Sequence, residues 1–150
     1  MTRVFTSLED VRAAVGRPIG PTEPLVVSQD RINAFANATD DQQWIHTDPV
    51  RAAKGPYGGT IAHGYLTLSL IPQFGRHLFS LEFGTARINY GVNRVRFPAP
   101  ARVNEALRAT VTFVDVTEAP AGAVLTARYV IEASSDKPAC VAETLVLITR

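Results

Sequence analysis

A strongly apolar segment over residues 64–74 is the feature that most restricts the fold. If it is helical, its large apolar side chains point in nearly every direction rather than along one stripe; they are Tyr65, Leu66, Leu68, Leu70 and Ile71. A helix that is apolar all round is buried on most sides. The segment is too short to cross a bilayer, so protein must cover it. We therefore expect one helix packed inside the rest of the chain.

Four segments that follow this helix have the alternating pattern of β-strands. They cover residues 86–97, 106–116, 124–133 and 139–148, and turn-forming residues separate them. Consecutive long strands joined by short turns indicate an antiparallel sheet. A buried helix followed by such a sheet predicts an α+β fold in which the sheet curves around the helix.

The sequence of the first 60 residues predicts shorter helices and strands. Ser7 begins a capping box for a helix that stops at Gly16, a strand follows at residues 25–27, and Ser28 can cap a second helix. Periodicity then fails from Thr39 to Gly59, apart from a short helix begun at residues 48–49. A loop of this length in a compact domain is usually functional or disordered, and the large side chains within it indicate order.

Length and charge limit the number of domains and the kinds of partner that this chain can have. A chain of 150 residues fits a single domain over residues 1–150 that buries a core without disulfides or metals. A net charge of +1 without a basic block disfavours nucleic acid as a partner. No segment has the length of a membrane span and no secretory pattern opens the chain, so we expect a soluble, cytoplasmic protein. The lone Cys140 is interpreted as a buried hydrophobe.

The densest polar cluster lies in the irregular loop, where Asp41 precedes His46 by five positions. A carboxylate and an imidazole brought together by a turning loop can hold one water and exchange protons with a substrate. The alternative is that Asp40, Asp41 and Asp48 cap helices and that His46 is solvated. A metal site is disfavoured, because His63 is the only other histidine nearby and no paired cysteine or HExxH spacing exists.

Other residues are candidates for substrate binding. Backbone N–H groups at the start of the buried helix, near Gly64, can stabilise an oxyanion, although glycine there also suits close packing. Ser69 either bonds back to the carbonyl of Tyr65 or orients a catalytic group. Asn89 and Arg94 lie on the strand at 86–97, where arginine can meet phosphate or simply face solvent. A further candidate, in the irregular loop, is Tyr57.

Three motifs resemble the MaoC-type dehydratases, the family that includes (R)-specific enoyl-CoA hydratases. Residues 35–46 read Phe-Ala-Asn-Ala-Thr-Asp-Asp-Gln-Gln-Trp-Ile-His, residues 61–64 read Ile-Ala-His-Gly before the apolar helix, and residues 89–100 resemble the family's central strand and proline exit. The motifs occur in the family's order, and the likeness extends over essentially the whole chain. The family's catalytic Asp and His fall on Asp41 and His46.

Three positions depart from the family's first motif. Asp40 replaces glycine, Gln43 replaces asparagine and Trp44 replaces proline. The resulting pattern resembles a branch of single-domain proteins near nodulation protein N.

The resemblance implies a hot-dog fold, a place in fatty acid metabolism and reversible syn hydration of a trans-2-enoyl-CoA to the (R)-3-hydroxyacyl-CoA. Asp41 and His46 would manage the water and the protons, the backbone near Gly64 would polarise the thioester carbonyl, and Ser69 would support the pair. No metal or redox cofactor is expected. The expected partners are an acyl-CoA or acyl-carrier thioester and a second copy of the chain, with the acyl tunnel near the subunit interface. Two alternatives stay open: an acyl-CoA thioesterase and a non-catalytic acyl-thioester-binding domain.

Overall fold

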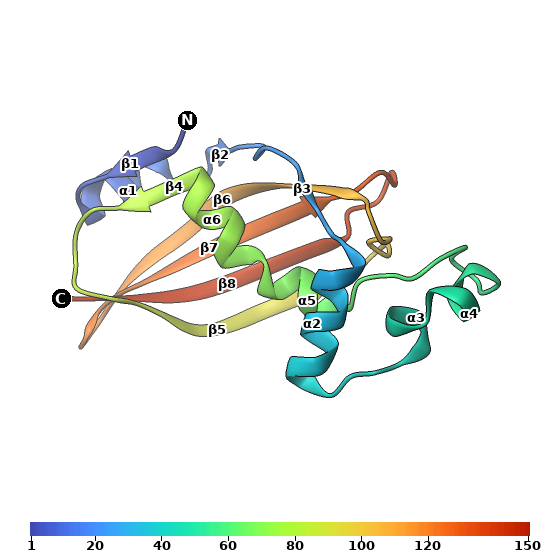
Figure 1. The fold of residues 1–150 in the computed structure, drawn as a ribbon. Helices are drawn as coiled ribbons and strands as arrows, with labels where there is room; N and C mark the ends of the chain where they lie inside the picture. The colour runs from blue at the N-terminus through green and yellow to red at the C-terminus, as the bar shows by residue number, and fades with distance from the viewer.

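The computed structural model describes residues 1–150, and a long antiparallel sheet dominates it (Figure 1). Its four long strands are β5 (Arg87–Arg96), β6 (Ala106–Ala119), β7 (Gly122–Glu132) and β8 (Cys140–Thr149). These bounds confirm the four strands predicted from alternation. Two short strands, β2 (Pro18–Ile19) and β3 (Leu25–Val26), pair with β6, and every pairing in this sheet is antiparallel.

The order of strands in the sheet is β2-β6-β7-β8-β5. Strands β6, β7 and β8 follow one another as hairpins, whereas β5 pairs with β8 and not with β6, its successor in the chain. The chain therefore crosses over between β5 and β6. This crossover leaves the other side of β5 as an edge of the sheet.

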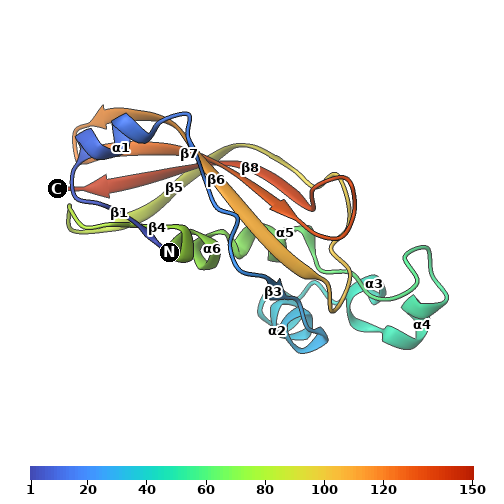
Figure 2. The same cartoon turned by 90° about the horizontal axis from the view of Figure 1, so that it is seen from above.

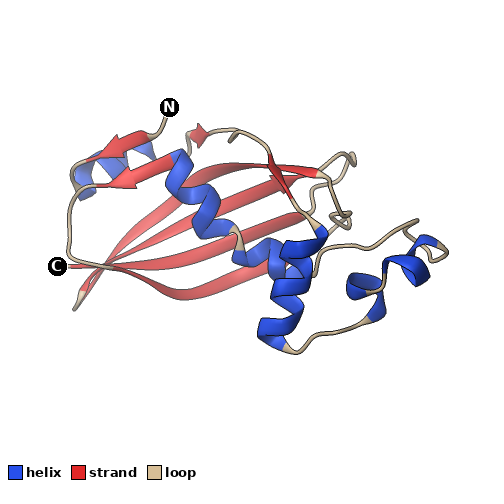
Figure 3. Ribbon diagram, in the orientation of Figure 1, coloured by secondary structure: helices blue, strands red, loops and turns tan.

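The buried segment forms two helices, α5 (Gly64–Ser69) and α6 (Ile71–Leu78), which lie across one face of the sheet (Figure 3). The prediction of one continuous helix over 64–74 was therefore wrong. The break at Leu70 follows from Pro72, which lacks the N–H that a continuous helix would use and whose ring would clash with the carbonyl four residues earlier.

The helix pair packs its buried side onto the sheet. Leu66, Leu70 and Phe74 are buried, whereas Tyr65 is 71% exposed, so burial on most sides was also too strong a prediction. Twenty-five buried residues form one core cluster that runs from Phe5 to Ile148 and draws on both the helices and the long strands. Each large apolar side chain buried there contributes about 1.5–3 kcal/mol to stability.

The remaining elements lie at the two ends of the sheet (Figures 1 and 2). Near the termini, β1 (Arg3–Phe5) and β4 (Phe79–Leu81) form a small parallel pair, and α1 (Leu8–Ala14) is capped by Ser7 as predicted. At the other end lie α2 (Gln29–Thr39), α3 (Trp44–Thr47) and α4 (Pro49–Ala53). The region predicted to be irregular thus holds α3 as well as the expected α4. None of the helices has the length and apolar character needed to cross a membrane.

Candidate active site

The turn after α2 places Asp41. Ser28 caps the start of α2, and Asp40 ends the helix in the left-handed conformation, with φ 61° and ψ 16°. Asparagine and aspartate adopt this conformation more readily than most residues do, although glycine adopts it at no steric cost. Asp40 thus makes a backbone turn that glycine would also allow, and Asp41 follows with its side chain exposed.

His46 lies on α3, and a hydrogen bond at one ring nitrogen holds its side chain. The residue is only 6% exposed, and its Nδ1 lies 2.7 Å from the carbonyl oxygen of Ile61. Because a carbonyl only accepts hydrogen bonds, this contact assigns the proton of the neutral ring to Nδ1. Nε2 is then left with a free lone pair, which is what a general base requires.

A short network fixes the backbone around His46. The side-chain amide of Gln29 donates to the His46 carbonyl at 2.7 Å, and the Thr60 hydroxyl donates to Gln29 at 2.5 Å. The Ile61 N–H donates to the Ile45 carbonyl at 3.0 Å, so the segment after Gly59 runs alongside α3. Sequence reasoning missed Gln29 and Thr60, because neither residue carries a motif and their contact spans 31 positions.

His63 is a further member of the site that was not predicted to have a role in it. It is 2% exposed, and its Nε2 lies 2.9 Å from the backbone carbonyl oxygen of Asp41. Its ring stacks on the ring of His46, with centroids 3.8 Å apart and planes inclined by 22°. Its Nδ1 is buried without a hydrogen-bond partner. The only signal in the sequence was its place in the Ile-Ala-His-Gly motif.

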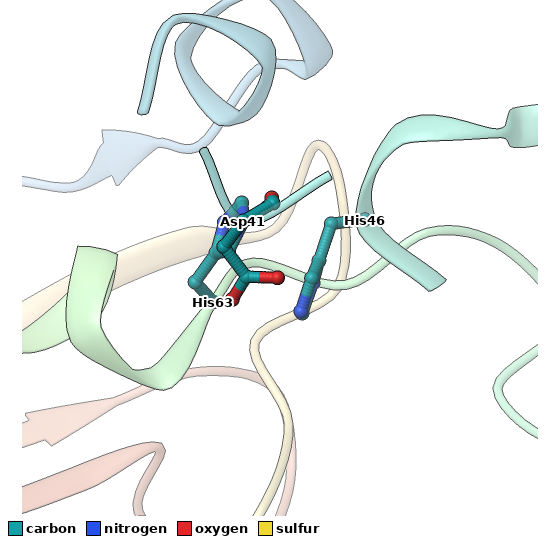
Figure 4. A group of neighbouring side chains, drawn as sticks. All are labelled: Asp41, His46 and His63. Carbon is teal, nitrogen blue, oxygen red and sulfur yellow. The ribbon is translucent and has the colours of Figure 1, made fainter. Parts of the chain in front are cut away.

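These three residues form one cluster, in which the Asp41 carboxylate lies beside the His46 ring (Figure 4). One side-chain nitrogen or carboxylate oxygen from each residue lies within 4.8 Å of the others. Burial lowers the pKa of His46 below its usual value of 6.5; the hydrogen bond to Ile61 opposes this shift, His63 adds to it and Asp41 opposes it. His46 is therefore neutral at neutral pH and able to accept a proton.

The ring geometry is poorly suited to a metal ion. A metal lies close to the plane of each imidazole that binds it, along the direction of the nitrogen lone pair. The nearly parallel rings of His46 and His63 direct their lone pairs along separate planes rather than to one point. Binding both nitrogens to one ion would require a ring to rotate out of the stack.

The predicted substrate-binding residues do not all lie together. Gly64 begins α5 directly after His63, and the Phe97 ring occupies the space where a side chain on Gly64 would lie. The Ser69 hydroxyl donates to the Tyr65 carbonyl at 2.6 Å and makes no hydrogen bond to Asp41 or His46. Arg94 is exposed on β5, and Tyr57 is half-buried in the loop after α4.

A groove of about 860 Å³ lies between the helix pair and the sheet. Ser69 and Asn89 both line it, together with apolar side chains from α6, β5 and β8. Asp41, His46, Tyr57, Gly64 and Arg94 are not part of its lining. Helix α5 connects the two regions, because it begins beside His63 and reaches the groove at Ser69, about 7 Å further along its axis.

The antiparallel sheet that packs around α5 and α6 defines a hot-dog protein, and the cluster of Asp41, His46 and His63 lies at the start of α5. The chain belongs to the family of MaoC-like dehydratases: the sequence model of the MaoC-like domain matches residues 10–134.

Relatives of known name agree with this assignment. The chain is 45% identical to 3-hydroxyacyl-thioester dehydratase Z of Mycobacterium tuberculosis, over 96% of this chain and 97% of that protein. It is 39% identical to nodulation protein N of Rhizobium meliloti, over 94% of this chain and 90% of that protein. Among solved structures, the (R)-hydratase from A. caviae superposes with a TM-score of 0.72 at 24% identity, covering 89% of this chain and 96% of that one. The resemblance found in the motifs is confirmed.

Proposed function

We propose that the protein is an (R)-specific enoyl-CoA hydratase that interconverts trans-2-enoyl thioesters and (R)-3-hydroxyacyl thioesters. The observation that carries this proposal is the buried His46, whose Nδ1–H is bound by Ile61 and whose free Nε2 lies in a cluster with the Asp41 carboxylate. A relative at 45% identity over nearly the whole chain bears the name of a 3-hydroxyacyl-thioester dehydratase.

Asp41 and His46 are proposed to hold the reacting water. A carboxylate and a neutral imidazole nitrogen are both acceptors, and a water molecule has two O–H donors, so one water can donate to each. As its oxygen bonds to the β-carbon, one proton passes to the pair. A proton then returns from the pair to the α-carbon on the same face, so the pair ends in its original protonation state. The lowered pKa keeps His46 in its neutral form, so the lone pair of its Nε2 is available to take the first proton.

The thioester carbonyl must be polarised while negative charge develops on its oxygen. Gly64 lies in the first turn of α5, where the N–H groups of a helix have no intrahelical acceptors. We propose that the N–H of Gly64, the residue after His63, donates a hydrogen bond to that oxygen. The proposed chemistry needs no metal or redox cofactor, because the thioester itself acidifies the α-carbon.

The acyl chain is proposed to extend along α5 into the apolar groove. Ser69 and Asn89 line the groove and would contact the acyl chain or the 3-hydroxyl group of the product. Arg94, exposed on β5, is the candidate for a phosphate of CoA or of an acyl carrier. Tyr57 lies after α4, in the same 39–59 segment as the pair, and is the candidate to cover the thioester.

We also propose a homodimer formed through β5. This ten-residue strand is the edge of the sheet, and the side chains of Ile88, Tyr90 and Val92 on it are exposed. A long edge strand with exposed apolar side chains is a template for pairing with another chain. Residues of the same strand line the groove, so a partner there would lie against the proposed acyl site. A cytoplasmic location is proposed as well, and the single buried Cys140, which cannot form an internal disulfide, supports it.

The pair is tested by following the loss of enoyl absorbance with crotonyl-CoA and with a longer trans-2-enoyl-CoA. Asp41→Asn and His46→Ala should each lower kcat about 100- to 10,000-fold, the usual contribution of a general acid or base. Asp40→Asn is the matched control, because it removes the neighbouring carboxylate and keeps a residue that tolerates the left-handed turn; it should change kcat less than threefold.

Two outcomes would contradict the proposal. Release of free thiol from a saturated acyl-CoA, detected with a thiol-reactive dye, would identify a thioesterase. Binding of both substrates without turnover would identify a non-catalytic acyl-thioester-binding domain. Chiral analysis of the hydrated product tests the (R) configuration.

A further inference from the structure

We propose that His63 is a positioning residue for this reaction: it holds Asp41 through the backbone and His46 through its ring, so that the two catalytic groups keep one relative geometry. The kinetic part of this inference rests on the proposed hydratase function, and the structural part does not. Three observations carry it, and each concerns a different atom or face of His63.

The first observation is the hydrogen bond to Asp41. Because the Asp41 carbonyl can only accept, the 2.9 Å contact assigns a proton to Nε2 of His63, which donates. The bond spans 22 positions and ties the exposed turn after α2 to the buried residue that precedes α5. The carboxylate of Asp41 has no hydrogen bond within the protein, so this backbone bond is what anchors the residue to the site.

The second observation is the stack on His46. His46 is held at its edge by Ile61, and the His63 ring lies against its face at a centroid distance of 3.8 Å. Phe35 packs against the His63 ring in turn, with centroids 4.9 Å apart. An imidazole that is bound at one edge and covered on one face cannot rotate freely, so its Nε2 keeps its direction relative to Asp41.

The third observation is the unpartnered Nδ1 of His63. An aromatic hydrocarbon ring such as that of phenylalanine would fill the same space without leaving a buried acceptor unpaired, and such acceptors are rare in proteins. Packing alone therefore does not account for histidine at this position. Histidine adds the Nε2–H that donates to the Asp41 carbonyl. It also places a second titratable ring against His46, and, in addition to burial, the repulsion between two protonated rings lowers the pKa of His46.

Three substitutions separate these roles. His63→Gln keeps an amide N–H near the place of Nε2; His63→Asn is the matched control, because its shorter amide reaches only the place of Nδ1; His63→Phe keeps the stack and loses the donor. We expect kcat with a trans-2-enoyl-CoA to fall about 10- to 100-fold in His63→Asn and His63→Phe, and less than fivefold in His63→Gln. KM should change less than threefold in all three variants. Circular dichroism and thermal melting establish that each variant folds.

A second measurement does not depend on turnover. The chain has three histidines, so histidine labelled with ¹⁵N gives three resolvable sets of signals, with the exposed His77 as internal reference. The wild-type spectra should show His46 as the Nδ1–H tautomer and His63 as the Nε2–H tautomer. In His63→Phe the pKa of His46 should rise, because Asp41 and His63 are the titratable groups that act on it and only Asp41 remains.

The outcomes are distinct. A folded His63→Phe variant with wild-type kcat, or one in which the pKa of His46 is unchanged, would overturn the positioning role. Equal losses of kcat in the glutamine and asparagine variants would overturn the hydrogen bond to Asp41 as its basis. If the wild-type protein hydrates no enoyl thioester, the proposed function fails, and the tautomers and the pKa of His46 still decide whether His63 holds the cluster.

Discussion

Single residues in and after the turn that follows α2 show how this chain accommodates its departures from the family motif. Asp40, which replaces the motif's glycine, takes a left-handed conformation that glycine adopts freely. Trp44 stands at the first position of α3, where proline is favoured because its missing N–H costs nothing there. In this chain the Trp44 ring instead packs close to Gly55 and beneath the Arg51 guanidinium, 4.3 Å from the ring centroid. Tertiary contacts thus replace the local restriction that proline would give.

The conformation of Asp40 predicts opposite effects of two small substitutions. Asp40→Ala should lower the free energy of unfolding by about 1 kcal/mol, because a β-carbon is strained at positive φ and alanine lacks the polar side chain that eases this strain. Asp40→Gly should not lower it, because glycine adopts this conformation freely. Urea denaturation of the two variants measures the difference. Equal stability of the alanine and glycine variants would contradict the left-handed assignment.

At the scale of elements, the site depends on how closely α5 and α6 approach the sheet. Gly75 on α6 lies against β7, where an added β-carbon would come within 2.8 Å of the Tyr129 hydroxyl oxygen. The tyrosine is buried, and burial raises the pKa of its hydroxyl well above the usual value of 10. The absence of a side chain at Gly75 therefore sets the distance between the helix and the strand.

This contact predicts a destabilising substitution and its rescue. Gly75→Ala should lower the free energy of unfolding by about 1–3 kcal/mol, the usual cost of overpacking, although alanine is the better helix former. Adding Tyr129→Phe should recover most of the loss, because the nearest remaining ring atom would lie 3.8 Å from the new β-carbon. A double-mutant cycle by thermal or urea unfolding measures the coupling. Additive effects of the two substitutions would show that Gly75 and Tyr129 do not limit the packing.

At the scale of the whole molecule, the Asp/His cluster, the groove and the free edge of the sheet lie on connected elements. Helix α5 runs from the cluster to the groove, and β5 supplies both a groove wall and the edge. An assembly through β5 would therefore affect substrate binding as well as stability. The surface of a monomer rarely exposes several large apolar side chains along an unpaired strand.

The proposed dimer predicts a difference between two equally exposed valines. Val92 on β5 is 51% exposed and Val26 on β3 is 53% exposed. Val92→Lys should shift the protein from dimer to monomer in light scattering coupled to size-exclusion chromatography, because it places a charge in the proposed interface. Val26→Lys should leave the dimer intact. A wild-type monomer, or dissociation by both variants alike, would contradict an interface at β5.

Local patterns in the sequence were sufficient for the four long strands and for three helix caps, and they indicated the candidate pair. Alternation over ten residues identifies a strand because successive side chains point to opposite faces, and Ser7, Ser28 and Asp48 cap helices through contacts three residues away. The family motifs identified Asp41 and His46 by residue type and spacing. Pro72 carried a signal for the break between α5 and α6, which the apolar pattern concealed.

Only the tertiary structure decided what surrounds the pair. The pairing of β5 with β8, the contact of His46 with Ile61, the link of Gln29 to Thr60 and the bond of His63 to Asp41 all join residues more than a dozen positions apart. No periodicity in a sequence records such contacts, because they depend on how the crossover and the loops bring distant segments together. The sequence alone therefore indicated the long strands, the helix caps and the candidate pair, and the fold determined which nitrogen of His46 is free and which residues hold it in place.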